Sequence, residues 1–214
     1  MAGTYGWFNR YEVYAVAILV IGGVYLLRPG FLRLHDKGHL AARIGLLAAL
    51  AFLVSPYASA VWETPQASRN IYEQQYQMHR FATEFFPRRV AVNDLGWVSY
   101  DNDSFVLDLW GLGSETVRKQ RAAKQFNADA IMDLANKADV DFAMVYQRWF
   151  KDSIPDSWCL MAVLKGEAVS VANEEVNFYA TRASAVADMR DALDRFAPTL
   201  PSRVTLRRLS SACT

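Results

Sequence analysis

Two apolar segments lie near the N-terminus, residues 13–27 and 44–61, and the remainder of the chain is much more polar. Flanking aromatic residues extend both toward the roughly 20 residues that cross a hydrocarbon core of about 30 Å. We therefore predict two transmembrane helices, at about residues 12–27 and 43–62, joined by a loop over residues 28–42. Buried core helices are the alternative, but neither apolar segment contains a charged residue.

The connecting loop is basic: Arg28, Arg33 and Lys37 lie in it and Arg43 directly follows it, whereas Asp36 is its single acid. Short loops rich in Lys and Arg stay on the cytoplasmic side of a membrane. We therefore expect residues 1–65 to form a membrane hairpin and residues 66–214 to form a water-soluble domain outside the cytoplasm.

The polar part of the chain shows alternating helical and extended patterns. We expect helices at residues 68–86 (with Ser68 as N-cap), just after Asn93 and Asp94, at 114–125, around 131–138 and from 184 onward, and strands at 88–92, 105–109, 141–146, 158–164, 169–181 and 203–209. Strands separated by helices pair in parallel, whereas the strands on either side of residues 165–167 suit an antiparallel hairpin. The predicted fold is thus an α/β domain with a mixed sheet and helices packed on it.

Composition limits the partners and the redox chemistry. The net charge of +1 over 214 residues gives no reason to expect nucleic acid or another acidic partner. The two cysteines, Cys159 in an apolar run and Cys213 beside the C-terminus, do not form a disulfide framework. We expect both to be free thiols.

Chemical motifs are few, and each has a structural alternative. The Gly111-Leu112-Gly113 turn could approach a phosphate, but a turn that needs positive φ is favoured. The spacing of Asp101 and Asp103 could hold a divalent metal, although a solvated turn explains it better. We predict no cofactor and no metal site, with that divalent metal as the alternative. A hydrolase would have to use His79, and no nucleophile motif accompanies it.

A basic helix face follows the glycine turn. Arg118, Arg121 and Lys124 lie on it and could contact a lipid phosphate or headgroup if the domain lies near a membrane. A solvated helix surface is the alternative. Membrane lipid is therefore an expected partner.

Three further segments carry a family resemblance: NIYEQQYQMHRF (residues 70–81), VAVNDLGWVSY (90–100) and VLDLWGL (106–112). Together they resemble the region after the last membrane helices of bacterial multi-spanning glycosyltransferases of the GT-C type, which are related to mannosyltransferases that use lipid-linked sugars. In that family the catalytic acid lies on an early outer loop, and this chain has no such loop. The resemblance therefore implies the C-terminal portion of such an enzyme, located in the bacterial inner membrane as a multi-pass protein.

The resemblance implies that the soluble domain assists substrate positioning, with a polyprenyl-phosphate sugar as a partner and further membrane helices supplied by the full-length protein or by a partner subunit. Asn93, Asp94, Tyr100 and Asp108 are the candidate substrate-binding residues, because they cluster at the ends of two predicted strands. Asp94 as a helix cap and Asp108 as a hydrogen-bond acceptor are the structural alternatives. The competing function is a non-enzymatic, membrane-anchored module that binds a protein or a glycan outside the cell.

Overall fold

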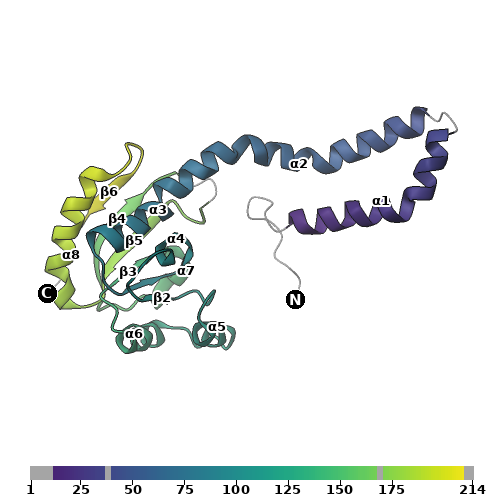
Figure 1. Cartoon of the computed structure of the whole chain (residues 1–214). Helices are drawn as coiled ribbons and strands as arrows, with labels where there is room; N and C mark the ends of the chain where they lie inside the picture. The colour runs from purple at the N-terminus through teal and green to yellow at the C-terminus, as the bar shows by residue number, and fades with distance from the viewer. Residues whose placement is uncertain (1–11, 37–39, 168–170, 210–214) are drawn as a thin grey trace. The chain divides into compact units, whose positions relative to one another are not determined.

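The computed structural model describes residues 12–36, 40–167 and 171–209 and divides the chain into two compact units, residues 1–67 and 68–214 (Figure 1). Helix α1 (Glu12–Asp36) and most of helix α2 (Leu40–Glu73) belong to the first unit. Helical structure in α1 therefore continues well past residue 27, where we expected the first span to end.

One helical region among the described residues, Arg43–Phe85, is long and apolar enough to cross a membrane, and none of its most apolar window is buried. The apolar part of α1, Tyr14–Leu26, is shorter. Large apolar side chains of both helices are exposed, among them Leu19 and Phe52. One of the two predicted spans therefore has a helix of sufficient length, and the two-span hairpin remains a proposal.

Helix α2 contradicts the expectation that a separate helix begins at Ser68, because α2 passes through Ser68 without interruption and ends at Glu73. Prolines are tolerated within apolar helices when hydroxyl groups satisfy the carbonyls that they leave free. Pro56 cannot donate to the carbonyl of Phe52, and the Ser55 hydroxyl donates to that oxygen instead, at 2.8 Å.

The second unit is built on one mixed sheet, as predicted, and its six strands lie in the order β2-β1-β3-β5-β4-β6. The strands are β1 (Val90–Val92), β2 (Val106–Asp108), β3 (Phe142–Val145), β4 (Cys159–Lys165), β5 (Glu175–Ala180) and β6 (Thr205–Arg208). Strand β1 pairs in parallel with β2 and β3, so that Ala91 lies beside both Leu107 and Ala143. The other three strands add antiparallel neighbours, and β6 forms one edge.

Short helices connect and cover these strands. They are α3 (Gln75–Arg80), the π-helical turn η1 (Phe81–Phe85), α4 (Gly96–Ser99), α5 (Glu115–Ala122), α6 (Ala128–Lys137), α7 (Gln147–Phe150), the 3-10 turn η2 (Lys151–Ser153), α8 (Ala183–Phe196) and the 3-10 turn η3 (Ala197–Thr199). Strands β1, β2 and β3 are separated by helical segments, as parallel pairing requires.

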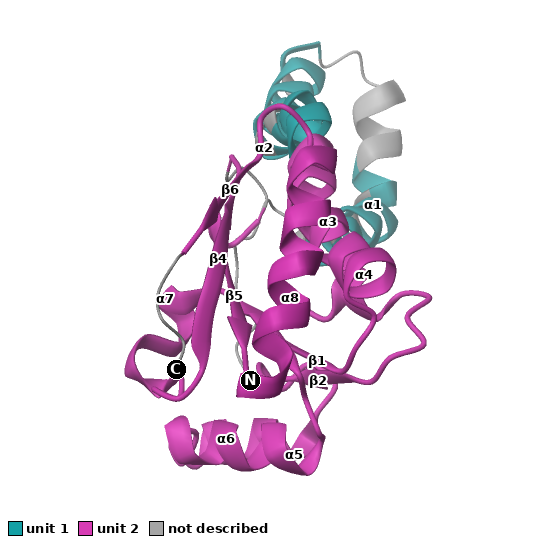
Figure 2. Cartoon of the chain, turned by 90° about the vertical axis from the view of Figure 1, so that its left-hand side faces the viewer, with its two compact units in different colours: residues 1–67 teal, residues 68–214 magenta. Residues whose placement is uncertain are grey.

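Both faces of the sheet are covered, which gives three layers (Figure 2). On one face α3, η1 and α8 pack against the sheet, with Phe81 and Phe196 in contact with Phe178 or with each other. On the other face Ile131 and Ala135 of α6 pack against the sheet. The central strands β1 and β3 are therefore buried on both sides, which explains their continuous apolar sequences, whereas the edge strand β6 is mostly exposed.

The N-cap position of α4 is Leu95, which makes no side-chain cap hydrogen bond. One smaller expectation, on the cysteines, was wrong. Cys159 is disulfide-bonded, so it is not a free thiol. The other cysteine of the sequence, Cys213, lies outside the described residues.

Candidate functional site

The carboxyl ends of the three parallel strands lie at one edge of the sheet. Asn93 directly follows β1, Asp108 ends β2, and Tyr146 directly follows β3. Because β1 lies between β2 and β3, polar groups from three separate parts of the sequence meet here. Ligands of open α/β sheets commonly bind at such an edge.

The carboxylate of Asp108 accepts hydrogen bonds from the backbone of the turn that follows it. Its Oδ1 accepts backbone N–H bonds from Trp110 at 2.7 Å and Gly111 at 3.0 Å, and its Oδ2 accepts from Gly113 at 2.6 Å and Ser114 at 3.0 Å. The turn thus closes around an internal anion, in the manner of a backbone nest. A phosphate would have to displace Asp108 to reach these N–H groups.

Gly111 shows why this turn requires glycine. Its φ is +90°, and a Cβ at this position would lie 2.9 Å from the backbone nitrogen of Arg118. The expectation of a positive-φ turn is confirmed, and the close approach of α5 explains the glycine at position 111.

The other candidate substrate-binding residues lie in different environments. Asn93 is buried and accepts the backbone N–H of Tyr146 at 2.7 Å, and its Nδ2 has no partner among the described residues. Asp94 accepts from Gln75 at 2.6 Å. Tyr100 is exposed, with its ring 5.7 Å from that of Trp97. None of the four candidates lines either of the two cavities described below.

A buried hydrogen-bond chain at this edge was not predicted. The Tyr146 hydroxyl donates to Oε1 of Gln74 at 2.7 Å, and Nε2 of Gln74 donates to the carbonyl of Asn173 at 2.7 Å. Burial raises the pKa of the Tyr146 hydroxyl, and the negative charge of Asp94 raises it further. Gln74 lies in the turn between α2 and α3, so this chain joins the end of α2 to the end of β3.

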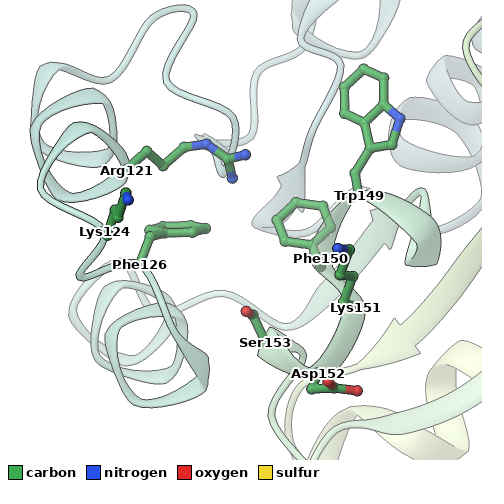
Figure 3. A pocket seen from close by; sticks show the side chains of 8 residues that line it. All are labelled: Arg121, Lys124, Phe126, Trp149, Phe150, Lys151, Asp152 and Ser153. Atoms are coloured by element: carbon green, nitrogen blue, oxygen red, sulfur yellow. The ribbon is translucent and has the colours of Figure 1, made fainter.

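A cavity of about 460 Å³ opens beside the segments that follow β2 and β3 (Figure 3). Its lining consists of Arg121, Lys124, Phe126, Trp149, Phe150, Lys151, Asp152 and Ser153. The first three residues come from α5 and the turn to α6, and the others come from α7 and η2. The cavity thus combines three cations, one carboxylate and three aromatic rings, which is the composition of a site for an anion with an apolar or planar part.

The guanidinium group of Arg121 is held by aromatic rings. It lies 3.7 Å from the ring centroid of Trp110 and 5.2 Å from that of Phe126. Trp110 in turn lies 4.2 Å from Trp149 of α7, measured between ring centroids. Partial burial lowers the pKa of Arg121, and the negative charge of Asp108 opposes this shift. These contacts fix the position of a cation that extends into the cavity (Figure 3).

Of the three predicted basic residues, Arg121 and Lys124 line this cavity. Arg118 instead forms two bonds to Glu115, from Nε at 2.6 Å and from the terminal nitrogen at 2.7 Å, which raise the pKa of Arg118 and lower that of Glu115. Lys151 was missed, because it follows a strand in a segment that we read as a connection. Lys151 lies on the same cavity as Arg121 because β1 pairs with β3, and no local sequence pattern indicates that pairing.

A second cavity, of about 570 Å³, lies at the opposite edge of the sheet, where β1, β2 and β3 begin. It is lined by Pro87, Arg88, Arg89, Asp103, Ser104, Phe105, Asp139 and Asp141. Arg88 pairs with Asp188 at 2.6 Å, and Asp139 pairs with Arg182 at 2.6 Å. Within residues 12–36, 40–167 and 171–209, no group of three or more histidine, cysteine or acidic residues is placed to hold a metal ion.

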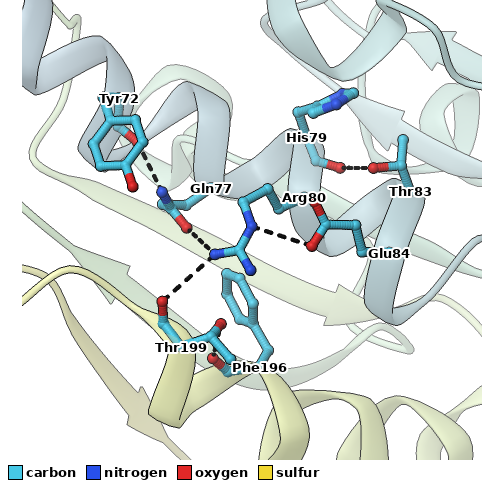
Figure 4. Close-up of polar contacts among 8 residues, drawn as sticks. All are labelled: Tyr72, Gln77, His79, Arg80, Thr83, Glu84, Phe196 and Thr199. Carbon is cyan, nitrogen blue, oxygen red and sulfur yellow. Dashed lines mark hydrogen bonds and ion pairs between the residues drawn. The ribbon is translucent and has the colours of Figure 1, made fainter.

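The region around His79 is a structural junction (Figure 4). The His79 ring lies 5.8 Å from Tyr76 and 6.0 Å from Trp97, and it lines neither cavity. The neighbouring Arg80 binds Glu84 at 3.2 Å and the carbonyl of Thr199 at 3.5 Å. The first bond joins α3 to η1, and the second joins α3 to η3, the segment that follows α8.

Comparison with curated proteins and with solved structures finds no match. One family model does match, over residues 69–179, and this range contains β1 to β3, most of the β4–β5 hairpin and the whole lining of the 460 Å³ cavity. The match covers more than half of the 214 residues. The chain therefore belongs to the family described as Domain of unknown function (DUF8728).

Proposed function

We propose that this chain is a membrane-anchored protein whose α/β domain binds an anionic ligand outside the cytoplasm. The observation that carries the proposal is the cavity lined by Arg121, Lys124 and Lys151 together with Trp149 and other aromatic rings. Three cations gathered around one cavity attract an anion together, although Lys124 and Lys151 are exposed and only Arg121 is partly buried. The aromatic faces favour a ligand that also presents a ring.

Membrane attachment is supported by α2, whose apolar window has no buried residue. Apolar helical surface of this extent is costly in water and is stable in a bilayer. The basic residues between the two apolar segments favour a cytoplasmic location for that connection and an outer location for residues 66–214. The disulfide bond of Cys159 supports an oxidising compartment for the domain.

A second candidate is the function implied by the glycosyltransferase resemblance. In this version the domain is the C-terminal part of a membrane glycosyltransferase, the ligand is a polyprenyl-phosphate sugar, and the catalytic acid comes from further membrane helices or from a partner subunit. The specific observation in its favour is that cations and aromatic rings line one cavity, because phosphate pairs with cations and sugar rings stack on aromatic faces.

The test is ligand binding by the full chain in zwitterionic detergent, measured by isothermal titration with inorganic phosphate and with a hexose 1-phosphate. The variant Arg121→Gln/Lys124→Gln/Lys151→Gln should lose at least about tenfold in affinity, the usual effect of losing one charge-assisted hydrogen bond. The matched control, Lys119→Gln/Lys137→Gln/Arg207→Gln, removes the same charge from exposed positions outside the cavity and should bind as the wild type does.

Equal affinity of the two triple variants, or no binding by the wild type, would refute the proposal. A polyprenyl-phosphate sugar presented in the same detergent separates the two candidate functions. Affinity at least tenfold above that of the hexose 1-phosphate would support the glycosyltransferase candidate. Equal affinity would count against it.

A further inference from the structure

Four described residues other than glycine have a positive φ: Asp101 at 45°, Lys124 at 56°, Asp139 at 55° and Lys151 at 48°. Aspartate tolerates this region, because its short side chain can bond to the nearby backbone. A lysine side chain gains no such compensation. Both of these lysines line the 460 Å³ cavity.

Each lysine occupies a position suited to glycine. Lys124 follows Ala123, the C-cap of α5, where helices commonly end in a glycine of left-handed conformation. Lys151 has φ 48° and ψ −117°, which lies outside even the left-handed helical region. Strained residues of this kind persist where the surrounding structure holds them, and they are concentrated at ligand sites.

The two lysines extend the cavity lining from opposite sides, Lys124 from the end of α5 and Lys151 from the end of α7, with Arg121 between them (Figure 3). With Asp152 as the one acid, the lining carries a net charge of +2. A phosphate monoester matches this charge, because it carries about −1.5 to −2 at pH 7 and three strong acceptor oxygens.

We propose that Lys124 and Lys151 form a clamp for a phosphate monoester, and that the bound phosphate compensates for the backbone strain and the repulsion among the cations. This inference rests on the proposed function and narrows it from an anion to a phosphate monoester. The monoester belongs either to a lipid headgroup or to a soluble sugar phosphate.

The experiment compares glycine and charge-removing variants of the full chain in zwitterionic detergent. Lys151→Gly should raise the melting temperature of the ligand-free protein by about 2 °C, because glycine relieves the strain. It should also weaken hexose 1-phosphate binding at least tenfold. Lys151→Gln, which keeps the strain and removes the charge, should lose the same affinity with a smaller thermal gain, because it relieves only the repulsion among the cations.

Asp101→Gly is the matched control, since Asp101 also has positive φ and lies outside the cavity. It should bind hexose 1-phosphate as tightly as the wild type. The wild type should bind dimethyl phosphate, a monoanion, at least tenfold more weakly than the monoester. Short-chain phosphatidate added to the micelles identifies the source of the phosphate. Tighter binding of phosphatidate than of hexose 1-phosphate indicates a lipid headgroup, and weaker binding indicates a soluble ligand. Both outcomes support the clamp.

The clamp is refuted if Lys151→Gly melts at or below the wild-type temperature, if it binds within twofold of the wild type, or if mono- and dianions bind equally. A wild type that binds none of these anions refutes the proposed function itself. Anion binding that survives in Lys151→Gly while the triple glutamine variant loses it refutes only the clamp.

Discussion

Replacing Asp108 by asparagine tests the role of its carboxylate as the internal anion of the glycine turn. The carboxylate accepts four backbone N–H bonds, two on each oxygen. Asparagine keeps the shape of the side chain, but its amide nitrogen would face two of these donors and accept from neither. Two charge-assisted bonds are therefore lost.

Hydrogen bonds to a charged group contribute about 1.5–3 kcal/mol each. Gly113 is exposed, so water can accept a hydrogen bond from its N–H in place of the lost carboxylate oxygen. We therefore take the lower end of this range for each bond. The free energy of unfolding should fall by about 3 kcal/mol for Asp108→Asn. A change of this size lowers the melting temperature of a chain of this length by about 9 °C.

Thermal unfolding of the full chain in detergent, followed by tryptophan fluorescence, measures this effect, since Trp110 lies within the turn. Asp103→Asn is the control, because Asp103 is an exposed aspartate in the same part of the chain and should change the free energy by less than about 0.5 kcal/mol. If Asp108→Asn unfolds at the same temperature as Asp103→Asn, the carboxylate does not organise the turn.

Three further predictions concern the core. Tyr146→Phe should lower the free energy of unfolding by about 1.5 kcal/mol at pH 7, measured by thermal unfolding, because it leaves Oε1 of Gln74 without its donor. Burial raises the pKa of Tyr146, so the unfolded chain loses this proton first, and stability should fall as pH rises above about 10 in the wild type and fall less in the variant. Phe81→Ala should cost about 4 kcal/mol in the same assay, since its ring contacts four other phenylalanines. Titration of the denatured, unreduced protein with a thiol reagent should detect no free thiol at Cys159, and a reactive Cys159 would contradict the disulfide.

The layers of the domain were predictable because they follow from local patterns. Strand β1 reads as Val-Ala-Val, buried on both faces, and helix α8 carries an apolar stripe that includes Met189, Leu193 and Phe196. The antiparallel β4–β5 pair followed from two extended runs separated by a short connection. The continuity of α2 was not predictable in this way, because a proline is usually read as a helix boundary, and here the Ser55 hydroxyl offsets the donor that is missing at Pro56.

Buried polar residues were the second source of error. Gln74 and Asn93 are each 1% exposed, yet a polar residue in a sequence pattern is ordinarily assigned to the surface. Their burial depends on partners that are distant in the sequence, because Gln74 bonds to Tyr146 and Asn93 bonds to the backbone of the same residue. Local periodicity contains no information about such partners.

The location of the cavity follows from strand order rather than from any motif. From the sequence we selected residues at the ends of β1 and β2, the strands that are adjacent in sequence. The carboxylate of Asp108, one of these residues, binds the backbone of the turn that follows it. Strand β3 lies on the other side of β1, so the segment after β3 brings Lys151 to the same edge of the sheet as Arg121. A ligand at this edge would contact residues from both segments at once, and strained residues such as Lys151 are concentrated at ligand sites.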